Sequence, residues 1–257
     1  MILEHQYPIC EFDTDRNAVI QAAGFLEKTL PEKCVITFFR KELLQLVEER
    51  QLPVIGRLYS EVMDSPIYQY TAGNGETICL LLPFMTAPGA ATTIEDLHAM
   101  GCERFLICGG AGSLRKGSRV GQIVVPTAAV RDEGTSYHYL PPAREVECHR
   151  GAADYVLAAL EKLGLPHTAG KTWTTDVAYR ETPALVERRR EEGCLTVEME
   201  AAAFFALSEY YDLPLSQLLY IGDDVSGREW DKRSWDSRKS IRENLIALSL
   251  KLMEEWA

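Results

Sequence analysis

The sequence has little positive charge, no long apolar run and no recognisable leader. Only 27 of its 257 residues are Lys or Arg, against 38 Asp and Glu, which gives a formal net charge of −11. Binding to a nucleic-acid backbone usually requires a basic face, so we expect no nucleic-acid partner. A membrane-spanning helix needs about 20 consecutive apolar residues, and a secretory leader joins a basic start to an apolar run and a cleavage site. Neither pattern is present, so we expect a soluble protein with no membrane partner.

Paired cysteines are also missing. The seven cysteines are an odd number, no two of them form a C-x-x-C pair, and several lie within apolar, strand-like runs. Disulfide-stabilised proteins of oxidising compartments usually carry an even set of cysteines. We therefore expect buried, reduced thiols and a cytoplasmic location.

What remains is the composition of an ordinary globular protein, with 46% apolar and 25% charged residues. Strand-like and helix-like segments alternate, with a hairpin in the first half. The expected strands cover 34–38, 67–71, 78–82, 104–108, 122–125, 169–173 and 218–221. The expected helices cover 17–29, 40–50, 88–100, 152–163, 183–192, 198–207 and the chain from about 235. This alternation predicts one α/β domain over residues 1–257, with a mixed central sheet and helices on both faces.

The segment Leu195–Leu207 combines two acids with an alanine-rich, apolar run. Glu198 and Glu200 head this run, which we expect to be a buried helix. A buried carboxylate needs a partner, because desolvation otherwise destabilises or neutralises it. Two sugar hydroxyls would suit, since a carboxylate accepts two hydrogen bonds side by side and the helix N-terminus favours its charge. Alternatively, both acids are ordinary first-turn residues of a helix.

Other residues suited to a ligand follow directly after expected strands. The strand at 104–108 runs into Gly109–Ser113, whose three glycines could turn N–H groups toward an anion or form only a tight connection. The strand at 218–221 ends in Asp223 and Asp224. A partly desolvated Asp223 could act as a general acid, whereas Asp224 is more typical of a cap or turn.

Two polar and aromatic segments lie between these points. Trp173–Arg180 offers hydroxyls, an aromatic ring and a guanidinium, which suit a planar heterocycle that stacks on the ring and bonds through its edge. Val130–Tyr139 has the composition of a loop that closes over a site. Its His138 is as compatible with a structural role as with a catalytic one.

Four motifs occur together in a fixed order. They are Gly-x-x-Gly-Ser-Leu at Gly109–Leu114, Ala-Val-Arg-Asp-x-Gly-Thr-Ser at Ala129–Ser136, Val-Glu-Met-Glu-Ala-Ala-Ala at Val197–Ala203, and a strand that ends in an acid at Asp223. This order resembles that of the hexameric-type purine nucleoside and uridine phosphorylases, from about residue 34 to the C-terminus. The second and third motifs are specific to that family, and the glycine motif is less so.

This resemblance implies a three-layer α/β/α sandwich around a mixed, barrel-like sheet. It implies that Met199 and Glu200 hold the ribose, with Glu200 accepting the 2′- and 3′-hydroxyls and Glu198 in support. Asp223 falls where purine-cleaving members keep the acid that protonates the leaving base. The residues implied for the base pocket are Thr174, Thr175, Tyr179 and Arg180.

The phosphate site departs from the family pattern. The family motif Gly-Asp-Pro-x-Arg is replaced by Thr37-Phe-Phe-Arg40, which keeps only the arginine. Ile107 replaces a phosphate-binding arginine, and Gly110 replaces a hydroxyl residue. Arg40, Gly109 and Gly110 are then the expected phosphate contacts. Each lost charge-assisted contact should weaken phosphate binding by about 1.5–3 kcal/mol.

Family members commonly form dimers combined into hexamers, in which a neighbour's histidine and arginine complete each site. His5 and Arg57 are the candidates here, with Arg57 also a candidate for phosphate binding. The Gln and Arg that read uracil in the family are absent, and their places fall near Thr182 and Ala184. The expected assembly is a homo-oligomer, a dimer or a hexamer.

The resemblance thus implies a pentosyltransferase of nucleoside salvage and catabolism. It would cleave a purine or pyrimidine nucleoside with inorganic phosphate as co-substrate, without a metal or other cofactor. Two alternatives stay open. A nucleosidase would use water, which the missing phosphate contacts favour, and a non-catalytic nucleoside-binding protein would keep only the ribose acid.

Overall fold

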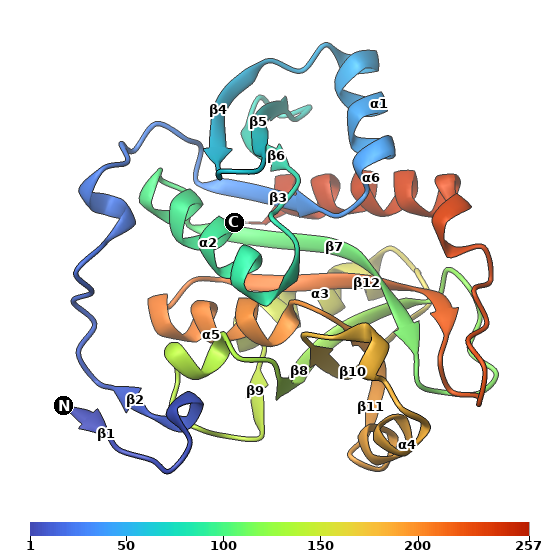
Figure 1. The fold of residues 1–257 in the computed structure, drawn as a ribbon. Coiled ribbons are helices and arrows are strands. Elements are labelled where there is room, and N and C mark those ends of the chain that lie inside the picture. The colour runs from blue at the N-terminus through green and yellow to red at the C-terminus, as the bar shows by residue number, and fades with distance from the viewer. Residues whose placement is uncertain (257) are drawn as a thin grey trace.

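A mixed ten-stranded sheet forms the centre of the molecule in a computed structural model that describes residues 1–256. Its strands are β3 (Lys33–Thr37), β4 (Val54–Tyr59), β5 (Asp64–Thr71), β6 (Thr77–Leu81), β7 (Arg104–Ser113), β8 (Ile123–Asp132), β9 (Glu145–Glu147), β10 (His167–Thr175), β11 (Cys194–Glu198) and β12 (Leu215–Asp224). The helices are α1 (Arg40–Arg50), α2 (Thr86–Ala99), α3 (Arg150–Lys162), α4 (Pro183–Glu191), α5 (Ala201–Tyr211) and α6 (Lys239–Glu255). Figure 1 shows the sheet running through the middle of the fold.

The sheet partly closes on itself. The strand order is β11-β10-β8-β12-β7-β3-β6-β5-β4, and β11 also pairs with β7. This second pairing, Thr196 with Ser113 and Val197 with Gly112, joins five strands into a ring. The ring confirms the expected barrel-like sheet, and it brings the end of β11 beside the ends of β7 and β12.

Helices cover the sheet on both faces, as expected. Adjacent strand residues point to opposite faces, so Ile36 joins a core beneath α2 and α5 while Val35 joins a core beneath α1, α3 and α6. The alanine-rich α5 is buried from Ala201 to Ser208, because its small side chains let it pack closely against the strands. The three-layer α/β/α architecture is therefore confirmed.

Several predicted boundaries were wrong. The helix expected at 17–29 is absent apart from a short 3-10 turn at Ala22–Gly24, because most of this segment lies exposed and its apolar side chains, such as Val19, Ile20 and Phe25, find little of the chain to pack against. The sheet strands β4, β9 and β11 were not predicted. The run that we expected to be helical from Glu198 begins as β11, and α5 starts only at Ala201.

The expected helix at 40–50, the expected hairpin and the cysteines agree with the structure. α1 has the predicted bounds, and β5 and β6 form the predicted antiparallel hairpin. All seven cysteines are free thiols, and six of them are buried. Among residues 1–256, no helix combines the length and the apolar character that crossing a membrane would require. A small separate pair of strands, β1 (Ile2–Leu3) and β2 (Phe12–Asp13), begins the chain.

Candidate active site

Glu198 and Glu200, the two predicted acids, lie at the junction between β11 and α5 and make different contacts there. Glu198 is the last residue of β11, and Glu200 precedes the first residue of α5. The Glu198 carboxylate accepts the N–H groups of Glu200 at 2.8 Å and Ala201 at 2.6 Å. Glu198 therefore satisfies donors that the start of a helix leaves free. The alternative of an ordinary helix-end acid applies to Glu198, which is buried and supports the site.

Thr174, predicted for the base pocket, completes the same helix start instead. Its hydroxyl donates to Glu198 Oε1 at 2.7 Å and accepts the N–H of Ala202 at 2.9 Å. The side chain is fully buried. The structure therefore gives Thr174 a different role from the predicted one, because the hydroxyl already donates and accepts within the fold.

Glu200 does not cap the helix. Its Oε1 accepts the N–H of Thr86 at the start of α2, at 2.9 Å, and the nearby backbone N–H of Met199 also favours its charged form. The residue is 8% exposed. Because most of its acceptor positions are unused, this buried carboxylate can still accept hydrogen bonds from hydroxyl groups of a ligand.

Burial shapes the ionisation of both acids. It raises the pKa of Glu200 to about 8, with the neighbouring charge of Glu198 as the second cause. Burial also raises the pKa of Glu198, to about 6, and the hydrogen bonds from Thr174 and the backbone oppose the rise. Glu200 is thus the acid whose charged form the unliganded site stabilises least.

Asp223 lies beside this junction at an irregularity in β12. The pairing of β12 with β7 shifts between Ile221 and Asp223, and such bulges re-aim side chains next to functional sites. A Cβ on Gly112 would lie 3.5 Å from Asp223 Oδ1 and 3.1 Å from Val197. The ring of strands therefore holds Asp223 against β7 and near the end of β11.

Two residues that the sequence did not indicate surround Asp223. The indole N–H of Trp230 donates to Asp223 Oδ2 at 2.6 Å. Burial raises the pKa of Asp223, and burial followed by the charge of Asp223 raises the pKa of Glu181 to about 7. Nothing in the sequence links these three positions, because they meet only through the fold.

The predicted glycine loop is a strand. Gly109 and Gly110 lie within β7, which continues to Ser113 in register with β12. A Cβ on Gly110 would lie 3.2 Å from the ring of Tyr220, and one on Gly109 would lie 3.3 Å from Phe38. The expected turn of N–H groups around an anion was wrong, since these glycines allow close packing of neighbouring side chains.

The other predicted base-pocket residues are spread out. Thr175 is buried, and its hydroxyl accepts the N–H of Val177 at 3.4 Å. Tyr179 is 98% exposed, and Arg180 is exposed in the same short 3-10 segment. Met199 is half-buried between the two acids. The chain alone therefore does not gather the four predicted base contacts into one pocket.

The predicted phosphate and partner residues are exposed. Arg40 is the first residue of α1, with no side-chain hydrogen bond or ion pair to any residue within 1–256. Arg57 lies on β4 and pairs with Asp64 at 2.8 Å. His5 lies in the exposed N-terminal segment, with its ring 5.7 Å from that of Tyr7.

Two neighbouring polar segments are structural. Asp224 accepts the N–H of Ser226 at 2.7 Å and forms an ion pair with Arg233, which confirms its expected role in a turn. In Val130–Tyr139, the buried Arg131 donates to Ser136 at 2.8 Å and to the Pro141 carbonyl at 2.8 Å. These bonds fix the segment, and His138 at its end is exposed.

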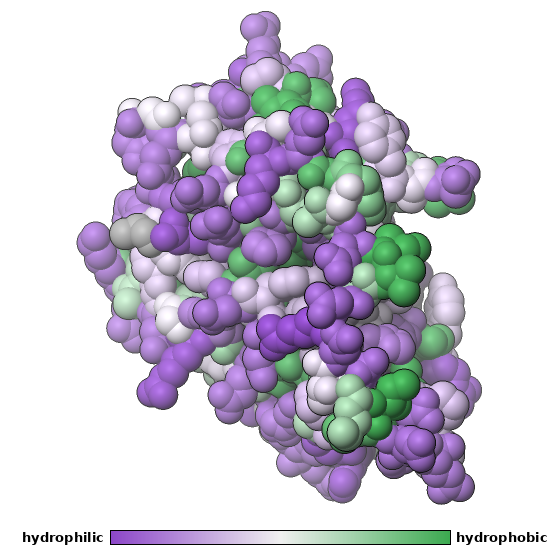
Figure 2. Space-filling model, turned by 90° about the vertical axis from the view of Figure 1, so that its left-hand side faces the viewer, coloured by the Kyte–Doolittle hydropathy of each residue, from purple (hydrophilic) through white to green (hydrophobic). Residues whose placement is uncertain are grey.

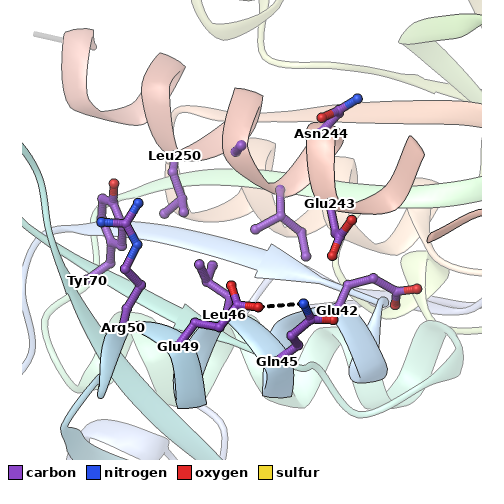
Figure 3. A pocket seen from close by; sticks show the side chains of 11 residues that line it. Glu42, Gln45, Leu46, Glu49, Arg50, Tyr70, Glu243, Asn244 and Leu250 are labelled. Carbon is purple, nitrogen blue, oxygen red and sulfur yellow. Dashed lines mark hydrogen bonds between the residues drawn. The ribbon is translucent and has the colours of Figure 1, made fainter. Parts of the chain in front are cut away.

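The groove in Figure 3 lies apart from these residues. It has a volume of about 290 Å³ and runs between α1 and α6, with Glu42, Glu49 and Glu243 among its polar lining. None of the predicted site residues lines it. Among residues 1–256, no three His, Cys, Asp or Glu side chains are grouped as metal ligands.

Fold and site together define a three-layer α/β protein with a buried carboxylate, Glu200, at a strand-to-helix junction. The sequence profile of the Phosphorylase superfamily matches residues 32–254, and the chain belongs to this family. Among its relatives are a guanosine phosphorylase of Halorubrum lacusprofundi, 32% identical over 158 residues, and a uridine phosphorylase of Thermococcus kodakarensis, 27% identical over 184 residues. These matches cover 61% and 65% of this chain, and 65% and 66% of the relatives' own lengths.

Solved structures share the fold over most of the chain. A uridine phosphorylase from Vibrio fischeri superposes with a TM-score of 0.75 at 17% identity, covering 90% of this chain and 95% of that chain. An AMP nucleosidase from Bacteroides thetaiotaomicron superposes with a TM-score of 0.69 at 22% identity, covering 88% and 89%. Phosphorylases and nucleosidases therefore share this architecture.

Replacing Thr174 by Val should destabilise the start of α5. The change leaves the buried Ala202 N–H without its partner and removes the shorter of two hydroxyl bonds to Glu198 Oε1, which should lower the free energy of unfolding by about 1–3 kcal/mol. Thermal unfolding measures the loss. Thr71→Val, at an exposed strand position, is the control, and equal melting temperatures for the two variants would contradict the assigned role.

Replacing Glu200 by Gln should stabilise the protein at alkaline pH. The pKa of Glu200 is about 8 in the fold and 4.5 without it, so the folded state binds the proton more tightly and the wild type loses stability as pH rises from 4.5 to 8. Gln has no such loss. Between pH 5 and pH 9 the variant should therefore gain on the wild type by at least about 1 kcal/mol, or roughly 2–4 °C in Tm.

The control for Glu200→Gln is Glu209→Gln, on the exposed side of the same helix. Its Tm difference from wild type should stay constant between pH 5 and pH 9. A constant difference for Glu200→Gln as well would show that Glu200 is not desolvated in solution.

Proposed function

We propose that this protein is a nucleoside phosphorylase, which cleaves the N-glycosidic bond of a nucleoside with phosphate to give a free base and (deoxy)ribose 1-phosphate. The observation that carries the proposal is the Glu200 carboxylate, buried at the start of α5 with acceptor positions unused. Its relatives that are named guanosine, uridine and purine nucleoside phosphorylase support the same reaction. A carboxylate of this kind suits the vicinal hydroxyls of a pentose.

Glu200 would hold the pentose while the bond to the base breaks. The sugar becomes positively charged in the transition state, and a nearby carboxylate at a fixed position stabilises that charge without reorganisation. Met199, between the two acids, would contact the sugar ring. Glu198 would act indirectly, because its hydrogen bonds to the start of α5 set the position of the backbone at Glu200.

Asp223 would deliver a proton to the departing base. Burial raises its pKa, which favours the protonated form that a general acid needs. The electrons of the broken C–N bond go to the base nitrogen, which takes the proton, and a phosphate oxygen forms the new bond to C1′. Thr175, Tyr179 and Arg180, from the end of β10 onward, remain the proposed contacts to the base.

Phosphate would bind near Arg40 and the glycines of β7. Arg40 supplies a charge at the N-terminus of α1, where backbone N–H groups also favour an anion. We still propose Gly110, which is exposed on β7, as a phosphate contact, whereas Gly109 is buried against Phe38. Arg57 would reach the site from a neighbouring copy. We propose inorganic phosphate as the co-substrate, with no metal or other cofactor.

Hydrolysis is the second candidate reaction. Ile107, which replaces the family's phosphate-binding arginine, is fully buried in the core beneath α2 and α5. Gly110 has no side chain to offer, so two of the usual phosphate contacts are missing. Water could then take the place of phosphate in the same site.

We propose that the protein works in the cytoplasm, in nucleoside salvage, as a homo-oligomer. Free, mostly buried thiols suit a reducing compartment. The N-terminal segment exposes large apolar side chains that a second copy could cover, including Val19, Ile20 and Phe25. Figure 2 shows hydrophobic side chains gathered in patches between polar ones on this side of the molecule. A neighbouring copy would bring His5 and Arg57 to the site.

An assay of base release tests the reaction. The protein is incubated with purine and pyrimidine nucleosides, with and without phosphate, and the free base is measured. Release that requires phosphate, with formation of a pentose 1-phosphate, is the expected result. Glu200→Gln should lower kcat/KM by roughly 100-fold or more, since it removes charge stabilisation from the transition state. Release without phosphate would support hydrolysis, and binding without release would show a non-catalytic protein.

Light scattering after size exclusion tests the assembly. The wild type should elute as a dimer or hexamer, and the pair Val19→Asp and Ile20→Asp should shift it toward the monomer and reduce base release. The control is Leu163→Asp, at the end of α3. A monomeric wild type with full activity would refute a site shared between copies.

A further inference from the structure

Thr86, the first residue of α2, has an unusual backbone conformation. Its φ is +69°, in the left-handed region that glycine adopts freely and that a β-branched residue rarely enters. Residues held in such conformations cluster at functional sites, where the surrounding structure imposes them. Thr86 also contacts the proposed substrate site directly, because its N–H donates to Glu200 Oε1.

The surrounding fold accounts for the backbone of Thr86. A Cβ on Gly89 would lie only 2.8 Å from the carbonyl carbon of Phe84, so the chain turns tightly before α2. The Phe84 N–H donates to the Thr93 hydroxyl at 3.1 Å, and that hydroxyl donates to the Gly89 carbonyl at 2.8 Å. These contacts fix the turn and direct the Thr86 N–H at Glu200.

The same contacts do not account for the Thr86 side chain. A glycine would supply the identical N–H without strain, so the threonine side chain must contribute something else at this position. The Thr86 hydroxyl makes no hydrogen bond to any residue within 1–256. By contrast, the hydroxyls of Thr92 and Thr93 in the same helix bond to the backbone carbonyls of Pro88 and Gly89.

We propose that the Thr86 hydroxyl binds a hydroxyl group of the pentose beside Glu200 and so helps to distinguish ribose from deoxyribose. The chemistry of the two side chains is complementary. A carboxylate only accepts hydrogen bonds, whereas a hydroxyl both donates and accepts. A sugar hydroxyl that donates to Glu200 keeps lone pairs, and the Thr86 hydroxyl donates to them. This inference rests on the proposed nucleoside site, and it holds whether phosphate or water attacks the sugar.

Three variants at one position separate the hydroxyl from the backbone strain. Thr86→Val keeps the branched shape and the strain but removes the hydroxyl, Thr86→Ser keeps the hydroxyl, and Thr86→Gly removes both hydroxyl and strain. Each is assayed with a ribonucleoside that the wild type cleaves and with its 2′-deoxy and 3′-deoxy forms. Thermal unfolding is followed in parallel, and Thr86→Gly should raise the Tm because it relieves the strain.

The expected result is selective for one sugar hydroxyl. Thr86→Val and Thr86→Gly should lower kcat/KM for the ribonucleoside about tenfold, the effect of losing one hydrogen bond. One of the two deoxy forms should stay within about twofold of wild type, because it lacks the hydroxyl that Thr86 binds. Thr86→Ser should keep the wild-type preference.

The alternatives give different patterns. Equal losses on all three substrates would show a structural role for Thr86, and a change confined to the KM for phosphate would place its hydroxyl on that ligand. Either result, or no loss, overturns the inference. If the wild type binds nucleosides without cleaving them, the same comparison is made with dissociation constants, so the inference is tested apart from the proposed reaction. If no nucleoside binds, both fail.

Discussion

The desolvated carboxylate of Glu200 is the feature on which the rest of the site depends. Glu198 and Glu200 lie two positions apart at the junction of β11 and α5, and they make different contacts there. Glu198 and Thr174 satisfy the donors at the start of α5, so Glu200 is not needed as a cap. Burying a second acid next to the first destabilises the fold unless the acid is protonated or bound. Such an arrangement is difficult to explain by stability alone.

The closed part of the sheet makes this junction possible. β11 pairs with β10 on one side and β7 on the other, so its end cannot move away from the glycines of β7. The register places Val197 opposite Gly112, and Gly112 packs against Asp223. Glu200 and Asp223, the acids proposed for the sugar and the base, are thereby held next to paired strands, which are stiffer than a loop.

The sequence predicted what depends on local pattern. Composition and alternation gave the α/β class, and the apolar face of residues 40–50 gave α1 with its bounds. The acid pair was found because charge beside a buried run is unusual.

Thr174 was misassigned because a polar residue at a strand end is equally suited to a ligand or a helix start. Glycine-rich spacing predicted a turn after 108, whereas packing against Tyr220 and Phe38 keeps those residues in a strand. Thr86 meets Glu200 across 114 residues of sequence, and Trp230 meets Asp223 through a loop, contacts that no helix or strand periodicity records.

The backbone strain of Thr86 and the desolvation of Glu200 both destabilise the fold, and a bound ligand could offset the second. Thr86 is strained and Glu200 is desolvated, and the hydrogen bond between them relieves neither fully. Hydroxyl donors from a ligand would favour the charged form of Glu200 and so lower its pKa. In the pH range between the lowered pKa and the raised pKa of the free protein, binding of such a ligand would release a proton. Ligand binding and ionisation of Glu200 would then be coupled, and the proposed pentose, by donating hydroxyls to Glu200, would offset the free energy that burying this acid costs.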